Sequence, residues 1–313
     1  MSGGQRGRVG SGDTGQSGLT LVELLVSMGI SLVIVVAASA FFLNSARTRD
    51  TQDEASQMQD NIRFATDLIT RNLQQAGFQN YMWASAGAVN RREVIPAADG
   101  EPDVRGYNNT AAAGSIDHGL HGRSTNRVNN SDTLVIRFQG SGASPGDGSM
   151  VDCLGRPQPE PLLAGDRAFS IFEVRQAAGA EPELRCKYFN SATGNYISEP
   201  IVRGVEALQF MYGVDTNADS FIDKWLNAAE VSPTASTTAL ADWARVRSVR
   251  VGMVFRSPNR VAVPASSAAS SATLQPLGAN LSQAGADDTL TVSSTDGRLR
   301  RVVTFTVNLR NAL

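Results

Sequence analysis

The stretch from Gly18 to Arg47 reads GLTLVELLVSMGISLVIVVAASAFFLNSAR, and it decides the fold. Its part from Leu24 to Leu43 holds 20 residues without a charged side chain. A run of about 20 apolar residues is long enough to cross the hydrocarbon core of a membrane as a helix. No small-residue cleavage site with a break follows the run, as it would after an ordinary signal peptide. We therefore expect this helix to stay part of the protein.

One carboxylate, Glu23, lies directly before the apolar run. An unpaired charge costs about 2.5–3.5 kcal/mol at the centre of a membrane helix, and less at the interface. Glu23 is therefore either an interfacial residue or a residue with a partner charge in the assembled protein. The segment 1–18 before it is rich in glycine and carries Arg6, Arg8 and Asp13, so we expect no folded element there.

A second periodic segment follows the apolar run. From Asn44 to Ala76 no proline or glycine interrupts the chain, and Gly77 stands where a helix C-terminal residue is expected. Apolar residues recur there at spacings of three and four, as in an amphipathic helix. The stripe comprises Met58, Ile62, Ala65, Ile69 and Leu73, widened by Phe64 and Leu68. We predict one helix over 19–76, roughly 87 Å long at 1.5 Å per residue, whose second half packs on a globular domain.

The remainder of the chain, 78–313, predicts a β-rich head. Six segments have the residue types or the alternation of strands: Thr133–Gln139, Ala168–Arg175, Glu183–Tyr188, Val205–Tyr212, Ser248–Arg256 and Val302–Leu309. The stretches 78–130 and 258–296 have no sustained period, and we predict loops there, the first with room for a short strand. The expected fold class is α+β, with the long N-terminal helix packed on an antiparallel sheet.

The composition fits an ordinary folded protein that binds no nucleic acid directly. Hydrophobic residues make up 42% and charged residues 19% of the chain, and the formal net charge is −2. No basic excess points to nucleic acid, and no acidic run points to a solvating tail. Any Ser/His/Asp grouping drawn from the sequence would be arbitrary, and no P-loop is present. We predict that the protein is not an enzyme.

The string Gly18-Leu19-Thr20-Leu21-Val22-Glu23 resembles the prepilin signature of type IV pilins. In that family the cleaved bond follows the glycine, the first mature residue is apolar, and Glu is the fifth mature residue. Leu19 departs from the family, which usually has Phe at this position. A short hydrophilic leader before the string and an apolar run after it complete the resemblance.

Later segments resemble the PilW minor pilins. The matching strings, in the order of the family, are Asn61–Ala65, Leu73–Phe78, Asp152–Gly155, Leu184–Cys186, Gly204–Glu206, Tyr212–Asp215, Trp243, Val246–Val251 and Leu309–Asn311. The stretches of about 80–130 and 257–297 do not match. The resemblance implies four segments: a leader over 1–18, a membrane or filament-core helix over 19–43, an amphipathic helix over 44–77, and an extracytoplasmic head over 78–313.

The resemblance also implies how the N-terminus is processed. A prepilin peptidase would cleave between Gly18 and Leu19, and the new α-amine of Leu19 would be N-methylated. In the filament, the Glu23 carboxylate would pair with the N-terminal amine of a neighbouring subunit. Such a pair is strong in apolar surroundings, where an unpaired charge is penalised heavily.

The function implied is that of a minor pilin that helps to start or cap a type IV pilus. Its partners would be other minor pilins, the major pilin, the peptidase and the inner-membrane assembly machinery. The protein would lie in the bacterial inner membrane with its head in the periplasm, and after assembly in the surface pilus. A minor pseudopilin of type II secretion is the near alternative. A membrane-anchored extracytoplasmic enzyme or sensor is the alternative from another class.

A polar segment in the head has the spacing of a calcium loop. Asp215, Asn217, Asp219 and Asp223 offer side-chain oxygens at positions 1, 3, 5 and 9, and Phe221 offers its carbonyl at position 7. Two positions depart from the pattern, because Ser220 replaces the glycine and Leu226 the final glutamate, although Glu230 lies nearby. We predict bound Ca²⁺ that braces this turn. The alternative is an Asx-rich turn between two strands.

The two cysteines and the two histidines are further candidates. A head outside the cytoplasm favours a disulfide between Cys153 and Cys186, with two buried free thiols as the alternative. His118 and His121 have a spacing that zinc sites use, but no further ligands stand nearby. We therefore interpret the His118–His121 segment as part of a solvated loop.

Overall fold

The structure is a computed structural model. It describes residues 20–80, 102–109, 111–112, 123–124, 128–162, 166–190, 195–232, 239–261, 271–281, 289–293 and 296–311. The chain divides into two compact units, Met1–Asp50 and Thr51–Leu313, and the boundary between them falls inside the long helix. We describe each unit by itself.

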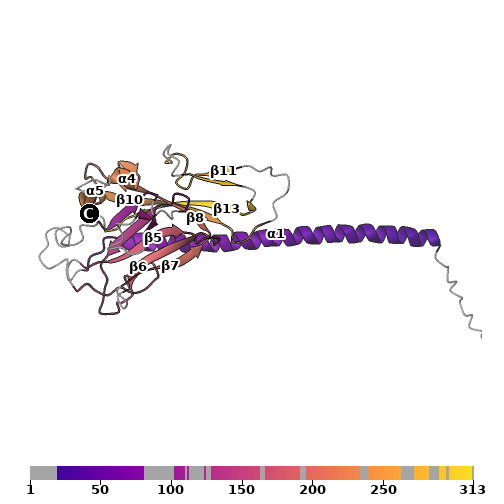
Figure 1. Cartoon of the computed structure of the whole chain (residues 1–313), viewed down its shortest axis with the longest axis horizontal. Helices are drawn as coiled ribbons and strands as arrows, with labels where there is room; N and C mark the ends of the chain where they lie inside the picture. The colour runs from indigo at the N-terminus through magenta and orange to yellow at the C-terminus, as the bar shows by residue number, and fades with distance from the viewer. Residues whose placement is uncertain are drawn as a thin grey trace, which may run out of the picture. The chain divides into compact units, whose positions relative to one another are not determined.

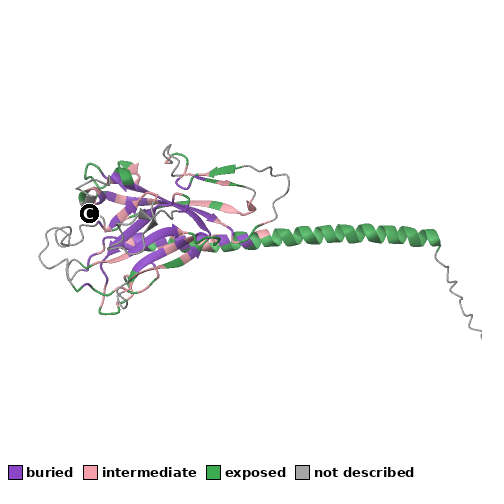
Figure 2. Cartoon of the chain, in the orientation of Figure 1, coloured by how far each residue is buried: buried purple, intermediate pink, exposed green. Residues whose placement is uncertain are grey.

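The long helix, α1, spans Leu21–Gln75 and is 55 residues long, which confirms the single helix predicted from the sequence. It ends before Gly77, whose φ of +71° is the left-handed conformation that glycine adopts readily at a helix end. The backbone N–H of Gly77 donates to the carbonyl of Arg137, 2.9 Å away, so the chain passes directly into the head. Figure 2 shows the N-terminal part of α1 exposed on all sides and its C-terminal part buried along one face.

Two antiparallel sheets form most of the described head. The five-stranded sheet has the order β1-β4-β5-β6-β7, and the four-stranded sheet has the order β13-β10-β8-β9. The strands of the first are β1 (Val104–Tyr107), β4 (Thr133–Phe138), β5 (Ala168–Arg175), β6 (Glu183–Asn190) and β7 (Asn195–Arg203). Those of the second are β8 (Val205–Val214), β9 (Lys224–Leu226), β10 (Val246–Arg256) and β13 (Arg300–Asn308).

Smaller elements complete the described part of the head. They are the hairpin strands β2 (Ala111–Ala112), β3 (Arg123–Ser124), β11 (Ser271–Leu274) and β12 (Leu290–Ser293), and the helices α4 (Ala228–Val231) and α5 (Ala239–Trp243). The apolar side of the β11–β12 hairpin packs on the four-stranded sheet, where Leu290 joins Ala207 and Val254 in a small buried cluster.

The α+β class and all six predicted strands are confirmed, but two details of the prediction are wrong. The strands divide between two sheets instead of one. The stretch 258–296 is not all loop, because it contains β11 and β12. Short, Ser/Ala/Thr-rich strands with one apolar face carry too weak an alternation to be recognised.

The core lies where the apolar stripe of α1 meets both sheets (Figure 1). Ile69 of α1, Phe172 of β5 and Val249 of β10 are fully buried in one cluster. Burial of each such side chain contributes about 1.5–3 kcal/mol to folding. The central stripe predicted from the sequence is confirmed as buried, whereas of the two residues that widen it Leu68 is half-buried and Phe64 is 54% exposed.

One strand glycine marks a close approach between the two sheets. Gly106 of β1 lies against the ring of Tyr212 in β8, and a Cβ at this position would be 1.9 Å from the Tyr212 hydroxyl oxygen. Tyr212 is fully buried and packs edge-on against Trp243, with ring centroids 4.8 Å apart. The ring therefore has no room to move away, and the strand needs glycine here.

We expect Gly106→Ala to destabilise the head by about 1–3 kcal/mol, the usual cost of overpacking. Thermal unfolding of the full-length protein in detergent, followed by tryptophan fluorescence, measures this change. Adding Tyr212→Phe removes the clashing oxygen, which has no hydrogen-bond partner among the described residues, and should recover part of the loss. Equal stability of Gly106→Ala and the wild type would contradict this account of the packing.

Candidate functional site

The first turn of α1 holds the Glu23 carboxylate in a reciprocal capping arrangement with Thr20. The backbone N–H and the hydroxyl of Thr20 both donate to Glu23 Oε2 at 3.0 Å, and the backbone N–H of Glu23 donates to Thr20 Oγ1 at 3.3 Å. This pattern satisfies N–H groups that a helix start leaves without intrahelical partners. The carboxylate therefore lies beside the start of the helix. Gly18 and Leu19 lie outside the described residues, and their roles stay predictions.

The part of α1 after Glu23 presents apolar side chains in every direction. Large hydrophobic residues from Leu24 to Leu43 are all at least half exposed, and Phe41 is 76% exposed. Among the described helices, α1 is long and apolar enough to cross a membrane, with a mean hydropathy of 2.5 over its most apolar window. A soluble environment would leave this surface in water, so the segment needs lipid or other apolar helices around it.

Three serines lie in this apolar segment, and each donates its hydroxyl to a backbone carbonyl of the same helix. Ser27 donates to the carbonyl of Leu24 at 2.9 Å, Ser31 to that of Ser27 at 2.7 Å, and Ser39 to that of Val35 at 2.7 Å. A polar group in lipid costs free energy unless it is hydrogen-bonded. These internal bonds let the serines enter apolar surroundings without that cost.

The C-terminal part of α1 is fastened to the head by several polar contacts that the sequence did not predict, among them one near each end of this part. Glu54 is buried and accepts two hydrogen bonds from Asn259, one from its backbone N–H at 3.0 Å and one from its side-chain amide at 2.7 Å. At the other end, the amide of Asn311 donates to the carbonyl of Ala76 at 3.0 Å. Glu54 continues the buried stripe four residues before Met58, and this spacing was the available signal.

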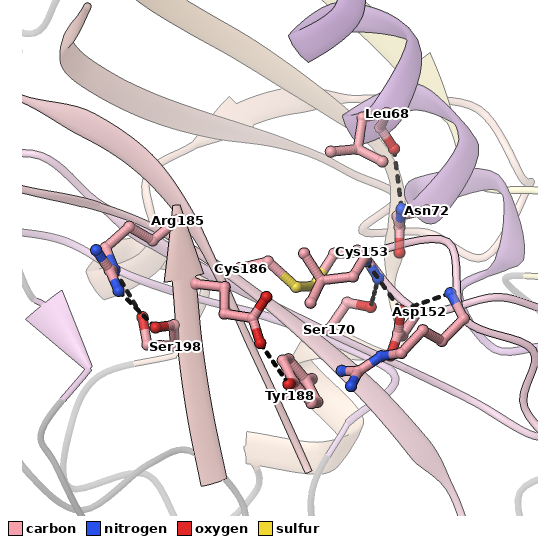
Figure 3. Close-up of a disulfide and its surroundings, with 12 residues drawn as sticks. Leu68, Asn72, Asp152, Cys153, Ser170, Arg185, Cys186, Tyr188 and Ser198 are labelled. Carbon is pink, nitrogen blue, oxygen red and sulfur yellow. Dashed lines mark hydrogen bonds and ion pairs between the residues drawn. A yellow bond between two sulfur atoms is a disulfide. The ribbon is translucent and has the colours of Figure 1, made fainter. Parts of the chain in front are cut away.

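The predicted disulfide is confirmed, and it lies between α1 and the five-stranded sheet (Figure 3). Cys153 and Cys186 have Cα atoms 5.8 Å apart and are almost fully buried. Cys186 belongs to β6, whereas Cys153 belongs to the loop after β4 and donates its backbone N–H to Ser170 Oγ at 2.9 Å. The bridge thus ties the loop 139–162 to the centre of the sheet.

The segment Asp215–Asp223 joins β8 to β9, as the calcium prediction and its alternative both require. Asp215 Oδ1 accepts from the backbone N–H of Ala218 at 2.6 Å. Asp215 Oδ2 accepts from the backbone N–H of Ser220 at 2.9 Å and from the Arg247 guanidinium at 3.0 Å. Burial alone would raise the pKa of Asp215, but Arg247 and the two N–H groups bring it below the ordinary value.

The other carboxylates of the loop are also engaged with the loop itself. Asp219 Oδ1 accepts from the backbone N–H of Phe221 at 2.8 Å, and its Oδ2 accepts from the Asn217 amide at 3.1 Å. Asp223 Oδ2 accepts from both the hydroxyl and the backbone N–H of Thr216 at 2.6 Å, and these bonds lower the pKa of Asp223.

This donor set fits calcium poorly. Ca²⁺ takes six to eight oxygen ligands, and Asp215 Oδ2, the buried oxygen at the first position of the pattern, is already paired with the Arg247 guanidinium. Glu230 is not available either, because its carboxylate accepts from the backbone N–H of Asn227 in the capping box of α4. Within the described ranges, no three His, Cys, Asp or Glu side chains lie close enough together to hold a metal. Calcium binding here stays a prediction that needs a direct measurement.

Two strings match enzyme motifs by spacing alone. Gly142–Gly146 has the spacing G-x-S-x-G, but it lies in the loop after β4 and not at the strand-to-helix turn of a nucleophile elbow. Gly10–Gly15 has the spacing G-x-G-x-x-G, and together with His118 and His121 it lies outside the described residues. Neither string gives a reason to assign a catalytic group.

Comparison with known proteins adds matches to two family models, one curated protein and one solved structure. Residues 171–311 match the family described as type IV pilus-assembly protein W, PilW, and residues 13–39 match the prokaryotic N-terminal methylation motif. The pilin-like protein PilA3 of Thermus thermophilus is 27% identical over 168 residues, which cover 49% of this chain and 65% of that protein. A solved type IV-like pilin of Thermus thermophilus aligns with 81% of this chain and 97% of its own, at 14% identity and a TM-score of 0.37.

The two matched regions coincide with the apolar N-terminal helix and with much of the described head. The methylation motif covers the Thr20–Glu23 cap and most of the exposed apolar helix, and the PilW match runs from β5 through β13 to Asn311. PilA3 is similar to this chain over about two thirds of its own length. This chain is therefore similar to type IV pilins in both parts, through an N-terminal methylation motif and a head that resembles PilW and PilA3.

Proposed function

We propose that this protein is a minor pilin that a prepilin peptidase processes and that helps to initiate or cap type IV pilus assembly. One observation carries the proposal: a methylation motif leads into a helix whose first turn holds a carboxylate and whose next 20 residues, Leu24 to Leu43, are apolar and exposed. A membrane anchor needs only the apolar surface. A subunit that leaves the membrane for a filament also needs a way to fix its register, which Glu23 supplies.

The proposed partners follow from the same segment. The peptidase would act at the bond between Gly18 and Leu19, and the apolar helix would then pack against the helices of other minor pilins and the major pilin. Before assembly the protein would lie in the bacterial inner membrane, with its head in the periplasm and in contact with the assembly machinery. The head serves binding and not catalysis in this proposal.

Mass spectrometry of sheared surface filaments tests the proposal. Trypsin cleaves after Arg47, so a processed subunit yields the peptide from Leu19 to Arg47, and we expect this peptide with one methyl group on the amine of Leu19. The same peptide from the membrane fraction reports on the subunits that have not been assembled. A leader still joined to the chain in both fractions would contradict the proposal and favour an anchored enzyme or sensor.

A minor pseudopilin of type II secretion would be processed in the same way, so the peptide alone does not distinguish the two systems. The PilW match favours the pilus. Deletion of the gene should abolish surface pili and leave the secretion of exoproteins unchanged. Loss of secretion with intact pili would favour the pseudopilin instead.

A further inference from the structure

A β-bulge in β10 brings the side chain of Arg247 to Asp215, the first residue of the Asp215–Asp223 loop. Val246 pairs with Val214 and Ser248 with Gly213, so Arg247 is an extra residue without a partner on β8. A bulge turns a side chain away from the regular alternation of the strand. The carbonyl of Arg247 accepts from the backbone N–H of Leu309, which holds the bulge against the end of β13.

The guanidinium of Arg247 contacts the carboxylate of Asp215, which is almost completely buried. The side chain of Asp215 is 1% exposed and that of Arg247 is 18% exposed. Two guanidinium nitrogens, Nε at 3.2 Å and Nη2 at 3.0 Å, donate to the same oxygen, Asp215 Oδ2. A buried carboxylate needs a paired charge or several donors, and Asp215 has both.

Arg247 of β10 therefore already supplies, next to Asp215, the positive charge that a metal ion would bring to this loop. We propose that the guanidinium of Arg247 takes the place of calcium and closes the Asp215–Asp223 loop without any bound ion. At least five of the six carboxylate oxygens of Asp215, Asp219 and Asp223 accept hydrogen bonds from the protein. A divalent cation at Asp215 would in addition be repelled by Arg247.

This inference goes beyond the proposed function, because it concerns what the head needs in order to fold. A pilin head that is braced by calcium depends on the calcium concentration outside the cell. A head that is braced by its own arginine keeps the β8–β9 connection closed at any calcium concentration. The calcium-like spacing of Asp215, Asn217, Asp219 and Asp223 is then explained by hydrogen bonds that shape the turn.

Thermal unfolding of the full-length protein in detergent, with calcium chloride or EGTA, separates the two accounts. An ion bound only to the folded state, at a hundredfold excess over its Kd, would raise the melting temperature by roughly 5–10 °C. We expect a change of no more than about 1 °C, with magnesium chloride as the control for general salt effects. A calcium-specific rise in the wild type would overturn the proposal.

Two single variants test the same proposal by changing the protein instead of the ion. Arg247→Gln leaves the buried Asp215 without its charge partner and should lower the melting temperature by about 5 °C or more. Asp219→Asn removes a carboxylate at a predicted calcium position, keeps an oxygen that accepts the Phe221 N–H and loses only the exposed bond from the Asn217 amide, so it should change little. The opposite ranking, with Asp219→Asn more harmful than Arg247→Gln, would support calcium and reject the arginine.

A double variant shows that the effect comes from the pair. Asp215→Asn combined with Arg247→Gln removes both charges, and should cost less than the sum of the two single variants. Additive costs would mean that Arg247 acts through another contact and would overturn the proposal. A calcium-dependent rise that appears only in Arg247→Gln would support it, since the freed Asp215 would then be open to an ion.

Discussion

Replacing Glu23 by Gln is expected to leave the leader cleaved normally but to deplete the protein from surface filaments about a hundredfold. Gln keeps the size of the side chain and the capping bond, because its amide oxygen still accepts the N–H of Thr20. It removes only the charge. The variant therefore separates the role of Glu23 in its own helix from its proposed role with a neighbouring subunit.

The size of the expected effect comes from the surroundings of the pair. In the filament, the amine of one subunit and the Glu23 carboxylate of the next would lie among apolar helices. Removal of one partner from a buried ion pair costs about 3–5 kcal/mol, because the other charge stays buried and unpaired. Every 1.4 kcal/mol is a factor of ten in an equilibrium.

The measurement is the ratio of this protein in sheared filaments to that in the membrane fraction, by quantitative immunoblot. Asp53→Asn is the matched control, since Asp53 is an exposed carboxylate on the same helix without an ion pair among the described contacts. Asp53→Asn should leave the ratio unchanged. If Glu23→Gln behaved like this control, Glu23 would serve only as a helix cap.

The sequence predicted the elements that depend on local patterns. The apolar run before Leu43, the stripe through Ile69 and the alternation in β13 are each legible in one window of residues. The pair Cys153–Cys186 was also accessible, because the chain has two cysteines, which have one possible partner each in a head expected outside the cytoplasm. These features need no knowledge of which segments meet in space.

What the sequence did not predict depends on contacts between distant segments. The bulge at Arg247 is defined by how β10 pairs with β8. The ion pair of Arg247 with Asp215 depends on the same register, which no local sequence pattern predicts. The burial of Glu54 depends on Asn259, which lies in a stretch expected to be loop. The edge strand β7 contains Pro200, which argues against a strand unless its position at the sheet edge is known.

Removal of the disulfide should destabilise the head by about 3–4 kcal/mol, the value expected when a bridge closes a loop of this length. Cys153 and Cys186 are 33 positions apart, and the bridge restricts the unfolded chain over all of them. The double variant Cys153→Ala/Cys186→Ala should therefore melt roughly 10 °C below the wild type. Trp243, which is buried against Tyr212, reports the unfolding by its fluorescence.

The double variant loses both the disulfide and some side-chain volume. A comparison of the wild type and the variant in reductant separates the contribution of the disulfide from that of the lost volume. Both sulfurs are buried between α1 and the sheet (Figure 3), so a thiol reductant should reach them only after the head opens. Wild type that is unfolded and reduced, and then refolded with its thiols kept reduced, should have the same melting temperature as the double variant. The remaining difference should be the small cost of the two cavities that the variant creates. Rapid reduction of the native protein, or a double variant as stable as the wild type, would show that the bridge does not hold the loop 139–162 against β6.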